Sequence, residues 1–144
     1  MKKVLVGMDG SPHSEAALDF AAEEASLRGA GLLVVCAWEL PMVVDPMAAY
    51  PGEWFERMQQ DADDLVKTAV ARVKESYPAV QTQGKAIEGH PAVVLLEEAK
   101  SADMIVLGSH GRGEFASLLL GSVAQQVIHH ATCPVVVVRL GAGK

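Results

Sequence analysis

Short apolar runs alternate with longer amphipathic stretches along the 144 residues of the chain. A strand covered on both faces reads as a continuous run of Val, Leu and Ile, so these runs predict buried strands. The predicted strands cover residues 2–8, 32–38, about 79–87, 103–107 and 134–139. Helical spacing predicts helices over residues 12–28, 53–75, 91–100 and 122–130. The alternation indicates an α/β fold with a parallel sheet and helices on both faces.

Local sequence signals add detail to two of these predicted helices and predict one long loop. Ser11 is a favourable N-cap ahead of Pro12, and Gly29 is placed to end the first helix. In the helix over 53–75, Trp54 and Met58 fall on the apolar face and are expected to face the core. Residues 39–52 are rich in proline and have no clear period, which predicts a long loop, a candidate lid or contact surface.

A glycine-rich segment joins the strand over 103–107 to the helix over 122–130. It runs from Gly108 through Gly111 to Gly121 and Ser122. Glycines allow backbone amides to approach a ligand, and the start of a helix directs unpaired N–H groups and a positive dipole end at the same place. This pattern is typical of phosphate binding. Its spacing matches neither the P-loop nor the dinucleotide-binding G-x-G-x-x-G turn.

Composition limits the function classes. The length favours one domain over residues 1–144, and a net charge of −6 excludes the basic footprint of a nucleic-acid-binding protein. The apolar run near Met1 ends at Asp9, too short for a secretion signal, and no run approaches the roughly 18 residues of a membrane span. We therefore expect a cytoplasmic protein. Cys36 and Cys133 lack a C-x-x-C spacing and are expected to remain free thiols.

The glycine segment, followed by Ser122, Val123 and the run over 131–138, resembles the ATP-binding branch of the universal stress protein family. The opening residues 3–11 also look like that family's first strand and turn, so the resemblance covers the whole chain. It implies a single-domain, doubly wound, five-stranded parallel sheet in the order 3-2-1-4-5. In such a sheet the ends of the first and fourth strands are neighbours, and ligands bind where the winding reverses.

The resemblance also implies a binding site for ATP or another adenine nucleotide, with Mg²⁺ arriving on the nucleotide and no metal ligands from the protein. Ala37 stands where the family commonly has valine, on the adenine side. Arg112 either clamps a phosphate or is a solvated loop residue, and His110 is either a base or donor or, by preference, a solvent-facing histidine. The residues that match ligand-side positions are Gly7, Asp9, Ala37, Leu107, Gly108, Gly111, Gly121, Ser122 and Val123, with Arg112 added from the loop.

Asp9 has two interpretations from the sequence. It can accept hydrogen bonds from a ribose hydroxyl or the adenine amine, or it can be a turn former ahead of a helix. The resemblance favours the first, since the family has an aspartate at this position.

The expected function is that of a stress-response regulatory protein whose contacts with an unidentified protein partner change with nucleotide occupancy. The resemblance also implies a homodimer through the last strand. The alternative is a slow nucleotide hydrolase or nucleotidyl transferase in the same crevice. Against it, the loop has no catalytic lysine, and few carboxylates beyond Asp9 and Glu114 could hold Mg²⁺. A phosphoacceptor domain needs an acidic pair after the first strand and an aspartate at the end of the third. It is disfavoured because residues 8–10 hold only one acidic residue, Asp9, and residues 87–88 hold a glutamate, Glu88, and no aspartate.

Overall fold

The computed structural model describes residues 1–40, 52–111 and 120–140. The predicted lid over 39–52 falls largely outside these residues, as do Arg112 and Glu114. The described elements are β1 (Lys3–Gly7), α1 (Pro12–Arg28), β2 (Gly31–Trp38), α2 (Glu53–Ser76), β3 (Thr82–Glu88), α3 (Pro91–Ala99), β4 (Met104–Gly108), α4 (Ser122–His130) and β5 (Val135–Val138).

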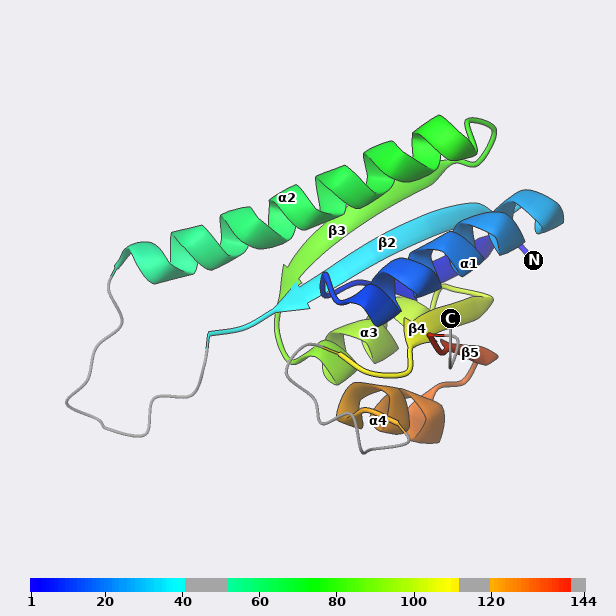
Figure 1. Ribbon diagram of the computed structural model, residues 1–144. Helices are drawn as coiled ribbons and strands as arrows, with labels where there is room; N and C mark the ends of the chain where they lie inside the picture. The colour runs from blue at the N-terminus through cyan, green and yellow to red at the C-terminus, as the bar shows by residue number, and fades with distance from the viewer. Residues whose placement is uncertain (41–51, 112–119, 141–144) are drawn as a thin grey trace.

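The five strands form one parallel sheet in the order β3-β2-β1-β4-β5, which confirms the predicted fold (Figure 1). At its centre, Leu5 of β1 pairs with Leu33 of β2 on one side and with Ile105 of β4 on the other. The chain therefore crosses from β1 to β2 in one direction and reaches β4 on the other side of β1. This reversal places the carboxyl ends of β1 and β4 next to each other.

Side chains alternate between two cores along each strand. Val4 and Val6 of β1 pack with α1 and α2 on one face, whereas Leu5 packs with α3 and α4 on the other. Figure 1 shows this three-layer arrangement, with α1 and α2 on the side of the sheet opposite α3 and α4. The central strands are covered on both faces, which explains their continuous apolar runs.

The ends of α1 follow the sequence signals. The Ser11 side chain accepts a hydrogen bond from the Ser14 amide at 3.2 Å, and Pro12 occupies the first turn. Gly29 ends the helix with φ at +63°, a left-handed conformation that favours glycine. Small buried residues such as Ala17 and Ala21 bring α1 close to the sheet. The first turn of α1 therefore has a fixed position beside the ends of β1 and β4.

Two expectations need correction. Trp54 is 41% exposed instead of core-facing, because the buried positions of α2 begin only at Ala62. Met58 is half-buried against the cluster around Trp38, closer to the expectation. Strand β3 begins at Thr82 instead of near Ala79, because residues 77–80 form a turn closed by a hydrogen bond from the Val80 amide to the Tyr77 carbonyl.

Two further expectations concern the cysteines and membrane-spanning helices. Cys36 is buried, Cys133 is half-buried, and both are free thiols as predicted. Among the described helices, none is long and apolar enough to cross a membrane.

Candidate functional site

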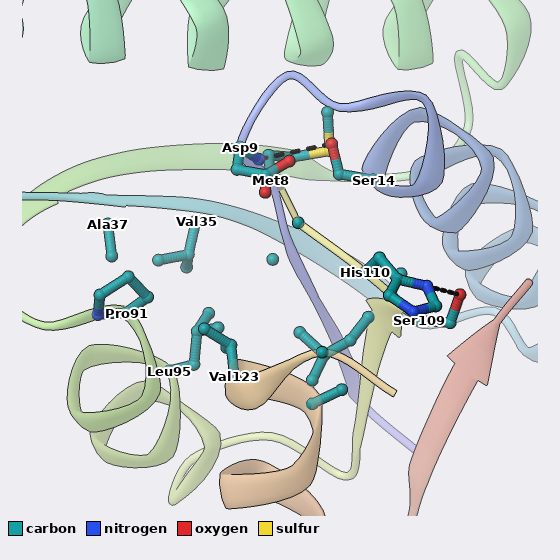
Figure 2. Close-up of a pocket in the computed structure, with 16 residues that line it drawn as sticks. Met8, Asp9, Ser14, Val35, Ala37, Pro91, Leu95, Ser109, His110 and Val123 are labelled. Atoms are coloured by element: carbon teal, nitrogen blue, oxygen red, sulfur yellow. Dashed lines mark hydrogen bonds between the residues drawn. The ribbon is translucent and has the colours of Figure 1, made fainter. Parts of the chain in front are cut away.

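A cavity of about 200 Å³ opens at the carboxyl ends of β1 and β4 (Figure 2). Elements far apart in the sequence contribute to it, from the end of β1 to the first turn of α4. The lining residues are Gly7, Met8, Asp9, Ser14, Val35, Ala37, Pro91, Leu95, Leu107, Gly108, Ser109, His110, Gly111, Gly121, Val123 and Ala124. The cavity lies at the topological switch point, where doubly wound folds bind ligands.

The wall at the end of β1 depends on Gly7. A Cβ at this position would lie 2.9 Å from Leu107 Cδ2 and 3.1 Å from Leu95 Cδ1. A side chain on residue 7 would therefore require the Leu107 and Leu95 side chains to shift at the wall of the cavity. The Met8 amide then donates to the Val35 carbonyl at 2.8 Å, which continues the strand pairing up to the rim of the cavity.

Asp9 stands at that rim, half-buried, and both interpretations of it have a geometric basis. Its Oδ1 accepts a hydrogen bond from the Ser11 amide at 2.9 Å, as a turn former would. It also lines the cavity, as a ligand contact would. Ser14, only 4% exposed, donates its hydroxyl to the Ser11 carbonyl at 3.0 Å, and its oxygen lies 3.4 Å from the Asp9 amide. These contacts fix the backbone of Asp9.

The structure gives Gly108 a reason of its own to be glycine. A Cβ here would lie 2.7 Å from the backbone carbonyl carbon of His13, in the first turn of α1. The sequence suggested that Gly108 makes room for a ligand. Its first constraint is instead the close approach of α1 to the end of β4.

Ser109 joins three parts of the site. Its amide donates to the Val138 carbonyl of β5 at 2.9 Å, and its carbonyl accepts from the Gly121 amide at 2.6 Å. The side chain is 2% exposed, and its Oγ lies 3.1 Å from Nδ1 of His110. Ser109 therefore holds the start of α4 and the end of β5 at the end of β4.

Helix α4 begins at the cavity. Gly121 is its N-cap and offers no capping side chain, while Val123 and Ala124 in the first turn line the cavity. The first turn of a helix carries amides without intrahelical partners and the positive end of the dipole. This end of the cavity is therefore suited to an anionic group.

Most predicted site residues meet at this cavity, and two do not. Ser122 is exposed on α4 and does not line the cavity, and Arg112 lies outside the described residues. His110 is half-buried and lines the cavity, instead of facing solvent. The predicted residues that line the cavity are Gly7, Asp9, Ala37, Leu107, Gly108, Gly111, Gly121 and Val123.

Sequence reasoning missed about half of the lining. Val35 could have been found, since it lies two residues before Ala37 and so shares its face of β2. Pro91 and Leu95 of α3 carry no local signal of a site. Together with Ala37 they form an apolar wall, opposite the polar groups of Asp9 and Ser14 (Figure 2). A mostly apolar cavity with a few polar groups is typical of small-molecule sites.

The described residues, 1–40, 52–111 and 120–140, offer no cluster of three or more His, Cys, Asp or Glu side chains that could bind a metal ion. A divalent cation at the proposed phosphate end would therefore need ligand oxygens and water for most of its coordination.

Known proteins are similar to this chain over nearly its whole length. A universal stress protein of Mycobacterium tuberculosis is 43% identical over 136 residues, which are 94% of this chain and 45% of that protein. The chain thus spans less than half the length of this relative. The solved structure of universal stress protein UspA from Lactobacillus plantarum superposes with a TM-score of 0.82 at 24% identity, covering 96% of this chain and 97% of that one.

Two further similar solved structures are described as complexes with a nucleotide. A universal stress protein in complex with cAMP is 27% identical with a TM-score of 0.72, covering 97% of this chain and 98% of that one. The universal stress protein from Archaeoglobus fulgidus in complex with dAMP is 26% identical with a TM-score of 0.69, covering 96% and 98%. The sequence model of the universal stress protein family matches residues 1–139. By this match and by its similarity to the mycobacterial relative, the chain belongs to the universal stress protein family.

Proposed function

We propose that this chain binds ATP or a related adenine nucleotide in the cavity between β1, β4 and α4. The observation that carries the proposal is the pairing of an apolar wall with the first turn of α4, which lacks a side-chain cap, in one cavity at the switch point. The cAMP and dAMP complexes of two similar proteins support the choice of an adenine nucleotide.

The cavity suggests an orientation for the ligand. The base lies against the apolar wall of Val35, Ala37 and Leu95, and the ribose lies near the Asp9 carboxylate. The phosphates lie toward the first turn of α4, where the helix amides and dipole favour negative charge. Mg²⁺ arrives with the nucleotide, bound mainly by its phosphates.

We further propose that the chain is a regulatory module of the stress response, cytoplasmic and dimeric. Nucleotide occupancy changes its contacts with a protein partner. The dimer forms through β5, an edge strand of four half-buried valines beside β4. An apolar edge strand tends to pair with another chain unless it is covered, and a two-fold axis would let it pair with its own copy.

The test of nucleotide binding starts with freshly purified protein. Denaturation followed by mass spectrometry of the released small molecules identifies any nucleotide that remains bound. Calorimetric titration of nucleotide-free protein with ATP, ADP, AMP and cAMP then ranks their affinities. We expect one saturable site per chain. Absence of saturable binding by all four nucleotides would overturn the proposal.

A slow hydrolase or nucleotidyl transferase is the second candidate for the same cavity. His110 and Asp9 line it and are groups that could accept a proton, which is the observation in its favour. We expect ATP turnover far below the ~1–100 s⁻¹ of kinases, because the described lining includes no lysine and no other carboxylate. A rate near 1 s⁻¹ that is lost in a Gly111→Val variant would establish the enzyme instead.

A further inference from the structure

Two histidines that are far apart in the sequence meet beside the cavity. His13 lies in the first turn of α1, and His110 follows the end of β4. Their ring centres are 5.2 Å apart, and the ring planes are tilted by 57°. Both side chains are half-buried. No spacing rule could have paired them, because the fold alone brings them together.

The backbones that carry the two rings are held firmly. A Cβ on Gly108 would overlap the backbone of His13, so α1 packs directly on the end of β4 two residues before His110. Ser14, next to His13, is tied to Ser11 by hydrogen bonds of 3.2 and 3.0 Å. On the other side, Ser109 is bound to both Val138 and Gly121. The backbone positions from which the two rings extend are therefore set by the core packing.

We propose that His13 and His110 form a site for a borderline divalent transition metal such as Zn²⁺. With Zn–N bonds of about 2.1 Å, two imidazoles on one tetrahedral ion have ring centres roughly 5 Å apart. The separation of 5.2 Å fits this geometry. Water or other oxygen donors complete the coordination. Neutral imidazole suits Zn²⁺, whereas Mg²⁺ and Ca²⁺ prefer oxygen ligands, so the site selects between these classes.

Ser109 is the positioning residue for this site. Its buried Oγ lies 3.1 Å from Nδ1 of His110. When Nδ1 carries the proton and donates to Oγ, Nε2 of the same ring presents a lone pair to a metal. Histidine ligands are commonly oriented by such a hydrogen bond from their second nitrogen. A metal at Nε2 therefore selects one tautomer of His110, with Ser109 as the acceptor.

Two features set the expected strength. The site supplies two imidazoles from the described residues, and the positive end of the α1 dipole opposes a cation near His13. Binding should therefore be weaker than in structural zinc sites with four protein ligands. His110 also lines the proposed nucleotide cavity, so the test uses nucleotide-free protein with the metal ion alone as the probe.

The experiment is a calorimetric titration of the untagged, reduced, nucleotide-free protein with ZnCl₂ at neutral pH. We expect one Zn²⁺ ion to bind per chain. The affinity for Zn²⁺ should fall at least about tenfold in His13→Ala and in His110→Ala. Ser109→Ala should weaken binding by about tenfold or more while both histidines remain. MgCl₂ should not bind to the nucleotide-free protein at this site.

The chain offers a matched control. His129 and His130 are adjacent on the exposed end of α4, with ring centres 6.5 Å apart. The double variant His129→Ala/His130→Ala should keep full Zn²⁺ affinity. In spectra of the imidazole ¹⁵N nuclei, only His13 and His110 should shift at one equivalent of Zn²⁺. The proposal is overturned by an absence of Zn²⁺ binding, or by binding that survives His13→Ala and His110→Ala.

Discussion

The backbone amide of Gly121 donates a hydrogen bond of 2.6 Å to the carbonyl oxygen of Ser109. This bond joins the two ends of the glycine-rich segment and uses the amide that the sequence would have assigned to a phosphate. Phosphate contacts at this end of the cavity must then come from later amides in the first turn of α4. Gly121 therefore closes the loop without placing a side chain in the cavity.

The first prediction concerns Gly121→Val. The backbone at Gly121, with φ at −70° and ψ at 163°, is extended and accommodates valine without strain. The added side chain would block the approach of phosphate to α4 and remove about two charged hydrogen bonds, roughly 2–4 kcal/mol. Calorimetry should show ATP affinity reduced by more than about thirtyfold.

Gly52→Ala is the control for that variant. Gly52 precedes α2, has a helical backbone, and has no heavy atom within 4 Å of the position of an added Cβ. ATP affinity should be unchanged in Gly52→Ala. Equal ATP affinities in wild type and Gly121→Val, with both folded by circular dichroism, would remove α4 from the proposed phosphate site.

Asp9→Asn separates the two roles of Asp9. The amide oxygen of asparagine can still accept from the Ser11 amide, so the turn should persist. The negative charge toward the ribose is lost, which should cost about 1–3 kcal/mol of nucleotide binding. Thermal unfolding should be nearly unchanged while calorimetry shows weaker binding. A lower melting temperature with unchanged affinity would mean that Asp9 is only a turn former.

The central strands and the helix ends could be predicted from the sequence because each carries a local physical signal. Ser11, Pro12 and Gly29 mark the ends of α1, and continuous apolar runs mark β1 and β4. Strand β3 was harder, because an edge strand has one neighbour and its residues, such as Gln83 and Lys85, are exposed. The prediction that Trp54 faces the core was wrong for a related reason. Helical spacing shows which face of α2 is apolar, but it does not show how far the sheet extends beneath the helix.

The site was predictable only where it lies on loops with a distinctive composition. Asp9 and the glycines stand out in the sequence, and so does Ala37 once the family is considered. Pro91 and Leu95 reach the cavity because α3 packs across the sheet, which depends on the topology and not on any local pattern. The pairing of His13 with His110 depends in the same way on α1 lying against the end of β4.

Asp103 is expected to make the folding stability of the chain fall at acid pH. Its carboxylate accepts hydrogen bonds from the amides of Lys2 at 2.7 Å and Lys3 at 2.9 Å. These bonds lower the pKa of Asp103 below its ordinary value of 3.8. Because the folded pKa is the lower one, the stabilisation is complete above the unfolded pKa and is lost as pH falls through the folded pKa.

Urea unfolding at several pH values between about 5 and 2 checks this contribution. Asp103→Asn should be less stable than wild type near pH 5 and should lose less stability on acidification. Glu75→Gln, which changes an exposed carboxylate on α2, is the control and should follow wild type. Parallel pH profiles for wild type and Asp103→Asn would show that the two hydrogen bonds do not stabilise the fold.

The dimer prediction is tested at Val137. Val136 and Val138 pack against the core on the α1 side of the sheet, and Val135 packs on the other side, so Val137→Lys spares those contacts. Wild type should have about twice the chain mass of 15.2 kDa by light scattering, and Val137→Lys should move toward one chain. Val93→Lys, at a position 64% exposed on α3, should leave the mass unchanged. A wild-type mass of one chain would exclude this interface.

The central claim is that an adenine nucleotide occupies the cavity between β1, β4 and α4. Its most direct test is a titration of ¹⁵N-labelled, nucleotide-free protein with ATP, followed by amide chemical shifts. We predict saturable shifts at Asp9, Ala37, Gly111 and the first turn of α4. Residues at the opposite end of the sheet, such as Gly31 and Gln81, should not move. The absence of saturable shifts at millimolar ATP, or shifts confined to residues away from the cavity, would contradict the account.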